Sequence, residues 1–233
     1  MTSTVDPKPM SRTRAILYAI GSPLTLVALV FLPVGRIDWI PGWIFIAVLV
    51  ALFSLSALLL ARENPIIYRA RSRFQPGTEK WDLMLLAVLL PAIIVEIPLA
   101  TLDAGRMGWS DVPLWFVLIG YVLLVGGVAV TTWAQAVNPF FEPGVRIQKE
   151  RAQRVVTSGP YRFVRHPGYS AAIAIFIAIP LALASWWALT PAALAIALLV
   201  VRTGLEDGLL RAELSGYVDY TRRTRYRLLP GLW

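Results

Sequence analysis

Long runs of apolar residues dominate the first 136 positions of this chain. An α-helix rises about 1.5 Å per residue, so about 20 apolar residues cross the ~30 Å hydrocarbon core of a bilayer. Four runs reach that length, and short stretches with polar residues, glycine and proline separate them. The pattern predicts membrane-spanning helices over roughly 15–35, 39–61, 81–102 and 113–136.

A fifth apolar region, 169–201, is too long for a single crossing. Two breaks interrupt it, one at Ser185-Trp186-Trp187 and one at Thr190-Pro191. We therefore predict a helical hairpin here. The whole pattern indicates an all-α integral membrane protein with a bundle of five to six transmembrane helices. The lower number applies if the hairpin only re-enters the membrane.

Basic residues are distributed very unevenly between the two sides of this predicted bundle. The chain has 22 lysines and arginines, and only Arg36 and Arg106 fall on the side of the first and third connections. The positive-inside rule places both termini and both long loops in the cytoplasm. For a bacterial source the membrane would be the plasma (inner) membrane. Anionic headgroups explain the net charge of +8, so no nucleic-acid partner is expected.

Composition supports the membrane assignment and narrows the chemistry. Hydrophobic residues make up 57% of the chain and charged residues 15%, which is unlike a soluble globular protein. All tryptophans except Trp233 fall near predicted span ends, as in an aromatic belt. The chain has no cysteine and one histidine, so we expect no disulfide and no metal centre. No glycine-rich nucleotide motif or phosphate-binding loop is present.

We expect one integral-membrane domain over residues 1–233. In this interpretation residues 1–136 form a four-span scaffold. Residues 137–233 supply a long cytoplasmic loop, the hairpin and a basic cytoplasmic tail.

The single histidine lies in the run 165–169, Arg-His-Pro-Gly-Tyr, at the start of the fifth apolar region. Proline is tolerated in the first turn of a helix, so Pro167 predicts a helix start. His166 would then lie beside free backbone N–H groups, which attract a carboxylate or phosphate. The alternative is a basic anchor at the membrane interface with a hydrogen-bonded histidine.

Two pairs of charged residues follow the hairpin at a spacing of one helical turn. Arg202 and Glu206 would share a helix face, pair, and come level with His166 if the hairpin closes. The alternative is a snorkelling arginine in an interfacial ion pair. Asp207 and Arg211 are expected to form a plain solvated pair on a neighbouring face.

Two weaker candidates lie in the first half of the chain. Glu96 is an acid within the third predicted span, which makes it a functional candidate. It would otherwise lie near the outer headgroups, or bond to a carbonyl freed near Pro98. The basic stretch 62–80 is expected to be positive-inside charge, and the alternative is contact with an acidic headgroup.

The last hundred residues carry a recognisable set of motifs. They are Gln148, the run 155–161 (Val-Val-Thr-Ser-Gly-Pro-Tyr), the run 165–169, Arg202 with Glu206, the run 217–220 and Leu-Leu-Pro at 228–230. In this order they resemble the isoprenylcysteine carboxyl methyltransferase family. That family belongs to a group of integral-membrane methyltransferases that includes phospholipid methyltransferases. The resemblance covers about residues 138–233, and the first four spans match only in hydropathy.

The resemblance implies S-adenosylmethionine as cofactor, in a cytoplasmic site, and a lipophilic or prenylated acceptor that arrives from the bilayer. It makes Arg202 and Glu206 the catalytic residues, with Arg202 facing the acceptor carboxylate. Gln153 stands where eukaryotic members tend to have histidine. The cofactor-binding residues it implies are Gln148, Gln153, Arg154, Val155, Val156, Tyr161, His166, Pro167, Gly168, Tyr169 and Glu206.

The chemistry is compatible with so few polar residues. A carboxylate is already ionised near neutral pH, so methylation of its oxygen needs no general base. The protein has to align two reactants and exclude water. Phospholipid N-methylation is the nearest alternative, but it would need a proton acceptor where Arg202 stands.

Two further classes fit the motifs less well. A reductase of the sterol-reductase type, which uses NADPH, commonly has an acid shortly after its Pro-x-Tyr motif, where this chain has Ser170-Ala-Ala. A transporter would place polar residues in the middle of broken helices, whereas here they crowd one end.

Overall fold

The computed structural model describes residues 12–71 and 74–233, with the side chains of 12–20, 22 and 68–70 excepted. Within these ranges the protein is entirely helical and has no strand. The helices are α1 (Arg12–Val34), α2 (Ile40–Glu63), α3 (Ile66–Arg71), α4 (Lys80–Thr101), α5 (Leu114–Val137), α6 (Pro167–Ala182), α7 (Leu189–Glu213) and α8 (Tyr217–Arg223). A π-helical turn, η1 (Leu102–Met107), extends α4. Two 3-10 turns, η2 (Lys149–Arg151) and η3 (Gly159–Arg162), lie between α5 and α6.

The predicted apolar runs form helices with nearly the predicted bounds. The four runs of the first half correspond to α1, α2, α4 and α5. The hairpin prediction is also confirmed, because α6 and α7 pack on each other and are joined by the short segment that holds Ser185 and the two tryptophans. Pro167 is the first residue of α6, as its tolerance at that position predicts.

Within the residues that the structure describes, three helices are long and apolar enough to cross a membrane: Ile40–Glu63, Lys80–Met107 and Leu114–Val137. α6 has 16 residues, and the second half of α7 carries Arg202, Glu206 and Asp207. The structure therefore supports a membrane protein with at least these three apolar spans. The total of five or six transmembrane helices stays a prediction.

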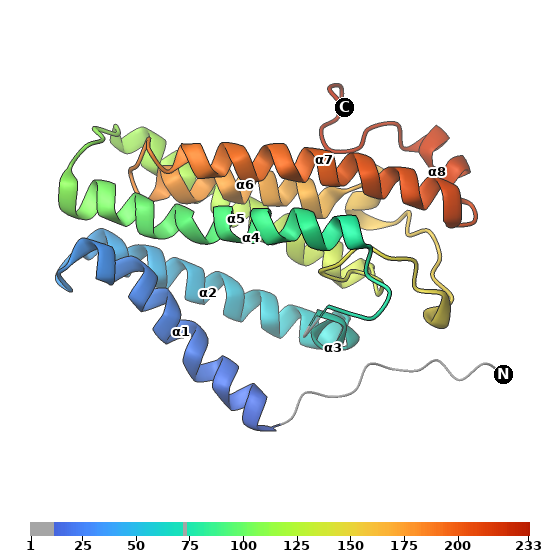
Figure 1. The fold of residues 1–233 in the computed structure, drawn as a ribbon, viewed down its shortest axis with the longest axis horizontal. Coiled ribbons are helices and arrows are strands. Elements are labelled where there is room, and N and C mark those ends of the chain that lie inside the picture. The colour runs from blue at the N-terminus through green and yellow to red at the C-terminus, as the bar shows by residue number, and fades with distance from the viewer. Residues whose placement is uncertain (1–11, 72–73) are drawn as a thin grey trace.

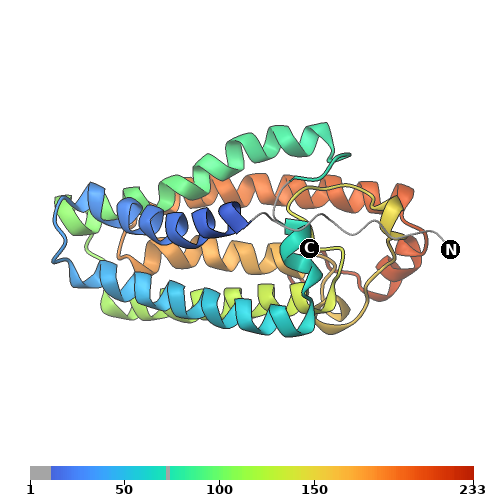
Figure 2. The same cartoon turned by 90° about the horizontal axis from the view of Figure 1, so that it is seen from below.

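Five long helices, α2, α4, α5, α6 and α7, run along one direction, and α1 slants away from them, so the bundle has two ends (Figure 1). The α1–α2 connection, η1 and the α6–α7 turn lie at one end, which we call the far end. α3, the loop between α5 and α6, and α8 lie at the other, which we call the pocket end. Seen from below, α2 runs beside α5 along one edge and α4 beside α7 along the other (Figure 2).

Glycines on one face of α5 allow α6 to come unusually close. A Cβ added at Gly120 would clash with the backbone of Ala182 and lie 2.8 Å from the carbonyl carbon of Leu181. A Cβ at Gly127, two turns further on, would lie 2.6 Å from the side chain of Ile175. Because lipid is as apolar as a leucine side chain, close backbone packing of this kind is a main source of helix association in a membrane.

A buried acid organises the far end. Asp103 is fully buried in η1 and accepts hydrogen bonds from the Ser110 backbone at 2.9 Å and from the Ser185 hydroxyl at 2.6 Å. Ser185 lies in the α6–α7 turn, and its oxygen also accepts a hydrogen bond from the Ala188 backbone at 3.1 Å. The acid thus joins the connection before α5 to the turn of the hairpin.

The α5–α6 contact provides a stability prediction with an internal control. Gly120→Ala should destabilise the protein by about 1–3 kcal/mol, because the added methyl meets backbone that cannot move aside. Gly126→Ala should be neutral or stabilising by up to about 1 kcal/mol, since nothing lies within 4 Å and alanine favours helix. Thermal unfolding in detergent measures both, and equal shifts for the two variants would contradict the packing argument.

Candidate active site

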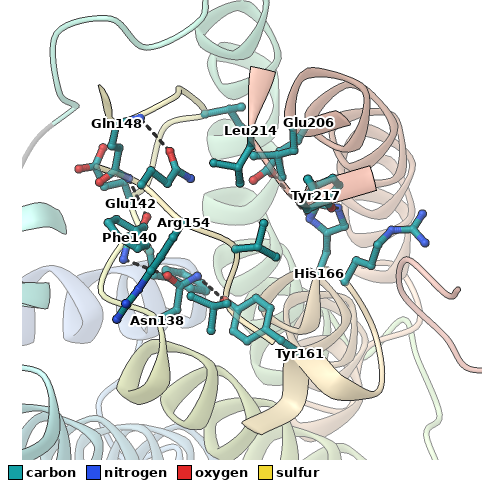
Figure 3. Close-up of a pocket in the computed structure, with 18 of the residues that line it drawn as sticks. Asn138, Phe140, Glu142, Gln148, Arg154, Tyr161, His166, Glu206, Leu214 and Tyr217 are labelled. Carbon is teal, nitrogen blue, oxygen red and sulfur yellow. Dashed lines mark hydrogen bonds and ion pairs between the residues drawn. The ribbon is translucent and has the colours of Figure 1, made fainter. Parts of the chain in front are cut away.

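A pocket that is partly open to solvent lies at the pocket end of the bundle. Its walls come from the loop between α5 and α6, the first turn of α6, the second half of α7, and α8. Figure 3 shows Gln148 and Glu142 across the pocket from His166 and Tyr217.

The eleven residues that the resemblance assigns to cofactor binding all line this pocket, although they come from four separate segments. They are Gln148, Gln153, Arg154, Val155, Val156, Tyr161, His166, Pro167, Gly168, Tyr169 and Glu206. Arg202 does not line it. The structure therefore brings together the predicted cofactor residues, and Arg202 lies behind one of them, Tyr169, outside the lining.

His166 is fixed between two neighbouring acids of α7. Its backbone N–H donates to the Arg227 carbonyl at 2.9 Å, and it forms the N-cap position of α6. Its Nε2 lies 3.5 Å from Asp207, and its Nδ1 lies 4.0 Å from Glu206. The hairpin has thus closed as expected, and the end of the sixth predicted helix is level with the histidine.

Asp207 is the centre of a buried ionic network, so the expectation of a plain solvated pair with Arg211 is wrong. The Asp207 side chain is 1% exposed and accepts two hydrogen bonds from Arg165, at 2.7 and 3.1 Å. Arg211, Tyr217 and Arg227 each donate a further hydrogen bond at 3.0–3.1 Å. The four-residue spacing correctly predicts Arg211 as a partner of Asp207. The other donors reach the same carboxylate only in the folded chain.

These donors decide the ionisation of the acid. Burial alone would raise the pKa of the Asp207 carboxyl, but hydrogen bonds from His166, Arg165 and Arg227 outweigh burial and hold the pKa well below its ordinary value. Arg165 also donates to the backbone carbonyls of Thr224 at 3.0 Å and Arg225 at 2.6 Å. The network therefore fastens the C-terminal segment to the start of α6.

Arg202 pairs with Asp82 and not with Glu206, which corrects the expected pairing. The Arg202 guanidinium donates to both oxygens of Asp82, at 2.6 and 3.0 Å, and to the Pro143 carbonyl at 2.7 Å. Glu206 instead accepts a hydrogen bond from the Tyr169 hydroxyl. The bidentate edge of Arg202, expected to face an acceptor carboxylate, is thus occupied by Asp82. That acceptor role stays a prediction.

Sequence reasoning missed Asp82, which lies in the first turn of α4. Its side chain is fully buried, and it also accepts a hydrogen bond from the Val145 backbone at 2.7 Å. One carboxylate therefore joins α4, α7 and the loop that roofs the pocket. An acid directly after Trp81 was the available signal, but it resembles an ordinary charge in the first turn of a helix.

Gln148 and Glu142 make the loop rigid. The Gln148 amide donates to the Phe140 carbonyl and accepts from Arg151, both at 2.7 Å, and its backbone N–H donates to the Gln153 side chain. Glu142 accepts two hydrogen bonds from Arg146, at 2.7 and 3.0 Å. The backbone and side-chain amides of Gln148 thus support the shape of the pocket.

Tyr161 closes the pocket floor. Its hydroxyl accepts a hydrogen bond from Asn138 at 2.8 Å, and its carbonyl accepts one from the Tyr220 hydroxyl at 2.6 Å. Burial raises the pKa of the Tyr161 hydroxyl, and the Asn138 hydrogen bond offsets this only in part. The same cause, burial, raises the pKa of Tyr220 to about 12. Both phenols are therefore neutral at physiological pH.

Some polar groups in the pocket remain open to a ligand. Arg154 has no ion-pair partner among the described residues, and it is exposed. Glu206 is partly exposed and presents a carboxylate on the opposite wall. A cation and an acid on facing walls, with aromatic side chains between them, suit a zwitterionic ligand that has an aromatic ring.

Residues 115–213 match the family model of the phospholipid methyltransferases. The match supports a membrane-embedded methyltransferase. The matched stretch runs from α5 through α7, and so contains the loop, His166 and Glu206, while α1–α4 lie outside it. It agrees with the group of integral-membrane methyltransferases to which the motifs point, and the isoprenylcysteine-specific assignment stays a prediction. No curated protein matches the chain.

Glu96 lies apart from the pocket residues, within α4. It is fully buried, and neither carboxyl oxygen has a hydrogen-bond partner among the described residues. The alternative in which it bonds to a carbonyl near Pro98 is therefore not observed. Its functional role stays a prediction.

The Asp207 network generates a prediction about stability. Asp207→Asn should cost about 3–5 kcal/mol, because it leaves the Arg165 guanidinium, 3% exposed, without its counter-charge. Asp219→Asn breaks an exposed pair with Arg222 and should cost less than about 1 kcal/mol. Thermal unfolding compares the two variants.

The pH dependence of stability should also separate the wild type from Asp207→Asn. Because the folded-state pKa of Asp207 lies below its ordinary 3.8, its contribution is complete above about pH 4 and is lost as the pH falls further. The wild type should therefore lose more stability than Asp207→Asn on acidification. Parallel acid profiles would contradict the assignment of Asp207 as the central charge.

Proposed function

We propose that this protein is an S-adenosylmethionine-dependent methyltransferase that acts on a lipophilic acceptor from the membrane. The observation that carries the proposal is the convergence of all eleven predicted cofactor residues on one pocket at an end of an apolar bundle. The family match over residues 115–213 supports the reaction class independently.

The residues that line the pocket fit this cofactor. Arg154 and the side-chain amide of Gln153 offer donors for its carboxylate, as does the N-terminus of α6. Glu206 offers an acceptor for its hydroxyl or ammonium groups. Aromatic and apolar side chains, among them Phe140, Leu214 and Tyr217, provide surface for a purine ring.

The chain itself has a limited set of tasks in such a reaction. Glu206 and His166 would bind the cofactor. Tyr169 orients the Glu206 carboxylate through its hydrogen bond. Arg202 lies with its guanidinium carbon 5.3 Å from the centre of the Tyr169 ring and is a positioning residue for that tyrosine. The loop held by Gln148 and Glu142 forms one wall of the pocket.

When bound, the cofactor supplies a methyl group on a cationic sulfur, so transfer forms an oxygen–carbon bond, breaks the sulfur–carbon bond, and leaves a neutral thioether. An acceptor carboxylate needs no deprotonation for this step. We therefore propose O-methylation of a lipophilic carboxylic acid of the isoprenylcysteine type.

Phospholipid N-methylation is the second candidate, and the family match favours it. An amine must lose its proton before it attacks, so this reaction needs a proton acceptor near the reacting nitrogen. Two groups that line the pocket could accept this proton, Glu206 and His166. Glu206 already accepts a hydrogen bond from Tyr169. The two candidates share an anionic, membrane-resident acceptor and differ in the atom that is methylated.

The first prediction here concerns the cofactor. Purified wild-type protein in detergent should bind S-adenosylmethionine and not NADPH, and Glu206→Gln should weaken that binding at least about tenfold by removing a charged acceptor. Glu213→Gln, an exposed acid of the same helix, is the matched control and should leave binding unchanged. Calorimetry measures all three proteins, and NADPH binding without methyl-donor binding would overturn the proposal.

The product identifies the acceptor atom. With methyl-labelled cofactor, a carboxyl methyl ester releases its label as methanol in alkali, whereas an N-methyl group stays on the lipid. Alkali-labile label in the lipid extract supports O-methylation, and alkali-stable label supports the N-methyl alternative.

The second prediction concerns orientation, for which we propose a cytoplasmic pocket end. Arg222→Cys lies at the pocket end and Asp38→Cys at the far end, and both positions are highly exposed. The chain has no other cysteine. Only Asp38→Cys should react with an impermeant thiol reagent on intact cells, and outside labelling of Arg222→Cys would reverse the orientation.

A further inference from the structure

Arg71 lies beside the pocket and has no counter-ion among the described residues. Arg71 is the last residue of α3, and it pairs with no carboxylate in the described part of the chain. This distinguishes it from Arg165 and Arg202, each of which is neutralised by a buried acid. The sequence alone offered two interpretations of this basic stretch, ordinary positive-inside charge or contact with an acidic group.

The segment that carries Arg71 is firmly held. α3 follows α2, a membrane-spanning candidate, after only a short turn. In that turn the Asn64 side chain donates to the Gln135 carbonyl at 2.7 Å, which ties the end of α2 to the end of α5. Ile67 is 1% exposed and anchors α3. Arg71 therefore lies at a defined place where an apolar span meets the pocket end (Figure 1).

Phe141 connects Arg71 to the pocket wall. The guanidinium carbon of Arg71 lies 5.2 Å from the centre of the Phe141 ring. Phe141 lines the pocket and packs so closely on Gly168 that an added Cβ would lie 2.7 Å from the ring. Phe141 therefore contacts both Arg71 and the first turn of α6.

The acids near Arg71 act on another arginine. Asp82 pairs with Arg202, and Glu206 also attracts the Arg202 guanidinium. Although Arg71 is an exposed residue overall, surrounding protein atoms lower the pKa of its guanidinium, and repulsion by Arg202 lowers it further. An arginine fork without an acidic partner among the described residues, at a membrane boundary, matches a carboxylate or phosphate group.

We propose that Arg71 binds the anionic group of the membrane-resident acceptor, a carboxylate or a lipid phosphodiester, beside Phe141. The description of this ligand as a methyl acceptor rests on the proposed function, whereas the anion site itself does not. Arg202, whose fork is occupied by Asp82, would then position Tyr169, and Arg71 would make the contact with the anion.

The test compares Arg71→Gln and Arg71→Lys with Arg62→Gln, an exposed arginine at the end of α2 that serves as the matched control. Each protein is placed in micelles of dodecyl maltoside, an uncharged detergent without a phosphate group. The probes are N-acetyl-S-farnesylcysteine, its uncharged methyl ester, and phosphatidylethanolamine as a competitor. The wild type should bind the acid more tightly than the ester. Arg71→Gln should weaken acid binding at least about tenfold and leave ester binding within about twofold.

Arg71→Lys should recover part of the affinity, and Arg62→Gln should match the wild type. Competition by phosphatidylethanolamine that Arg71→Gln abolishes would identify a lipid phosphate as the occupant, and its absence would favour the carboxylate. Unchanged acid affinity in Arg71→Gln, equal losses in Arg71→Gln and Arg62→Gln, or a wild type that binds neither anionic probe would overturn the proposal. Calorimetry with S-adenosylmethionine distinguishes failure of the anion site from failure of the proposed reaction. A wild type that binds the acid but not the cofactor would refute only the proposed reaction.

Discussion

The pocket end depends on one carboxylate that stays ionised away from water. Leaving a buried charge unpaired costs several kcal/mol, so Asp207 requires every donor that surrounds it. Those donors come from four places: Arg165 before α6, Arg211 on α7, Tyr217 on α8 and Arg227 in the C-terminal segment. Satisfying one charge therefore fixes four segments relative to each other, and the pocket is enclosed by them and by the loop after α5.

The same physical device recurs elsewhere in the bundle. Asp82 joins α4 to α7 and to the loop, and Asp103 joins η1 to the α6–α7 turn. Between apolar helices in lipid the hydrophobic effect has little power to choose a neighbour, so the arrangement must come from close packing and polar contacts. Gly120 and Gly127 supply the first on α5, and the three buried acids supply the second.

Features with local causes could be predicted from the sequence. Hydropathy located the long helices, the breaks near Ser185 located the hairpin turn, and Pro167 located the start of α6. The partner of Arg202 could not be predicted, because spacing favours Glu206, one turn away, whereas Asp82 lies 120 residues away in sequence. No local pattern in a single sequence records such a contact.

A count of basic residues on one side of a membrane treats them all alike, but the structure divides them into two classes. Arg165 and Arg202 are neutralised by buried acids and hold the fold together. Arg71 and Arg154 have no such partner in the described part of the chain, and they lie beside or within the pocket. Only the second class has charge left for an anion from outside. Which basic residues recognise a ligand therefore follows from where the buried carboxylates lie, and a site of this kind is found by identifying the cations that the fold leaves without a partner.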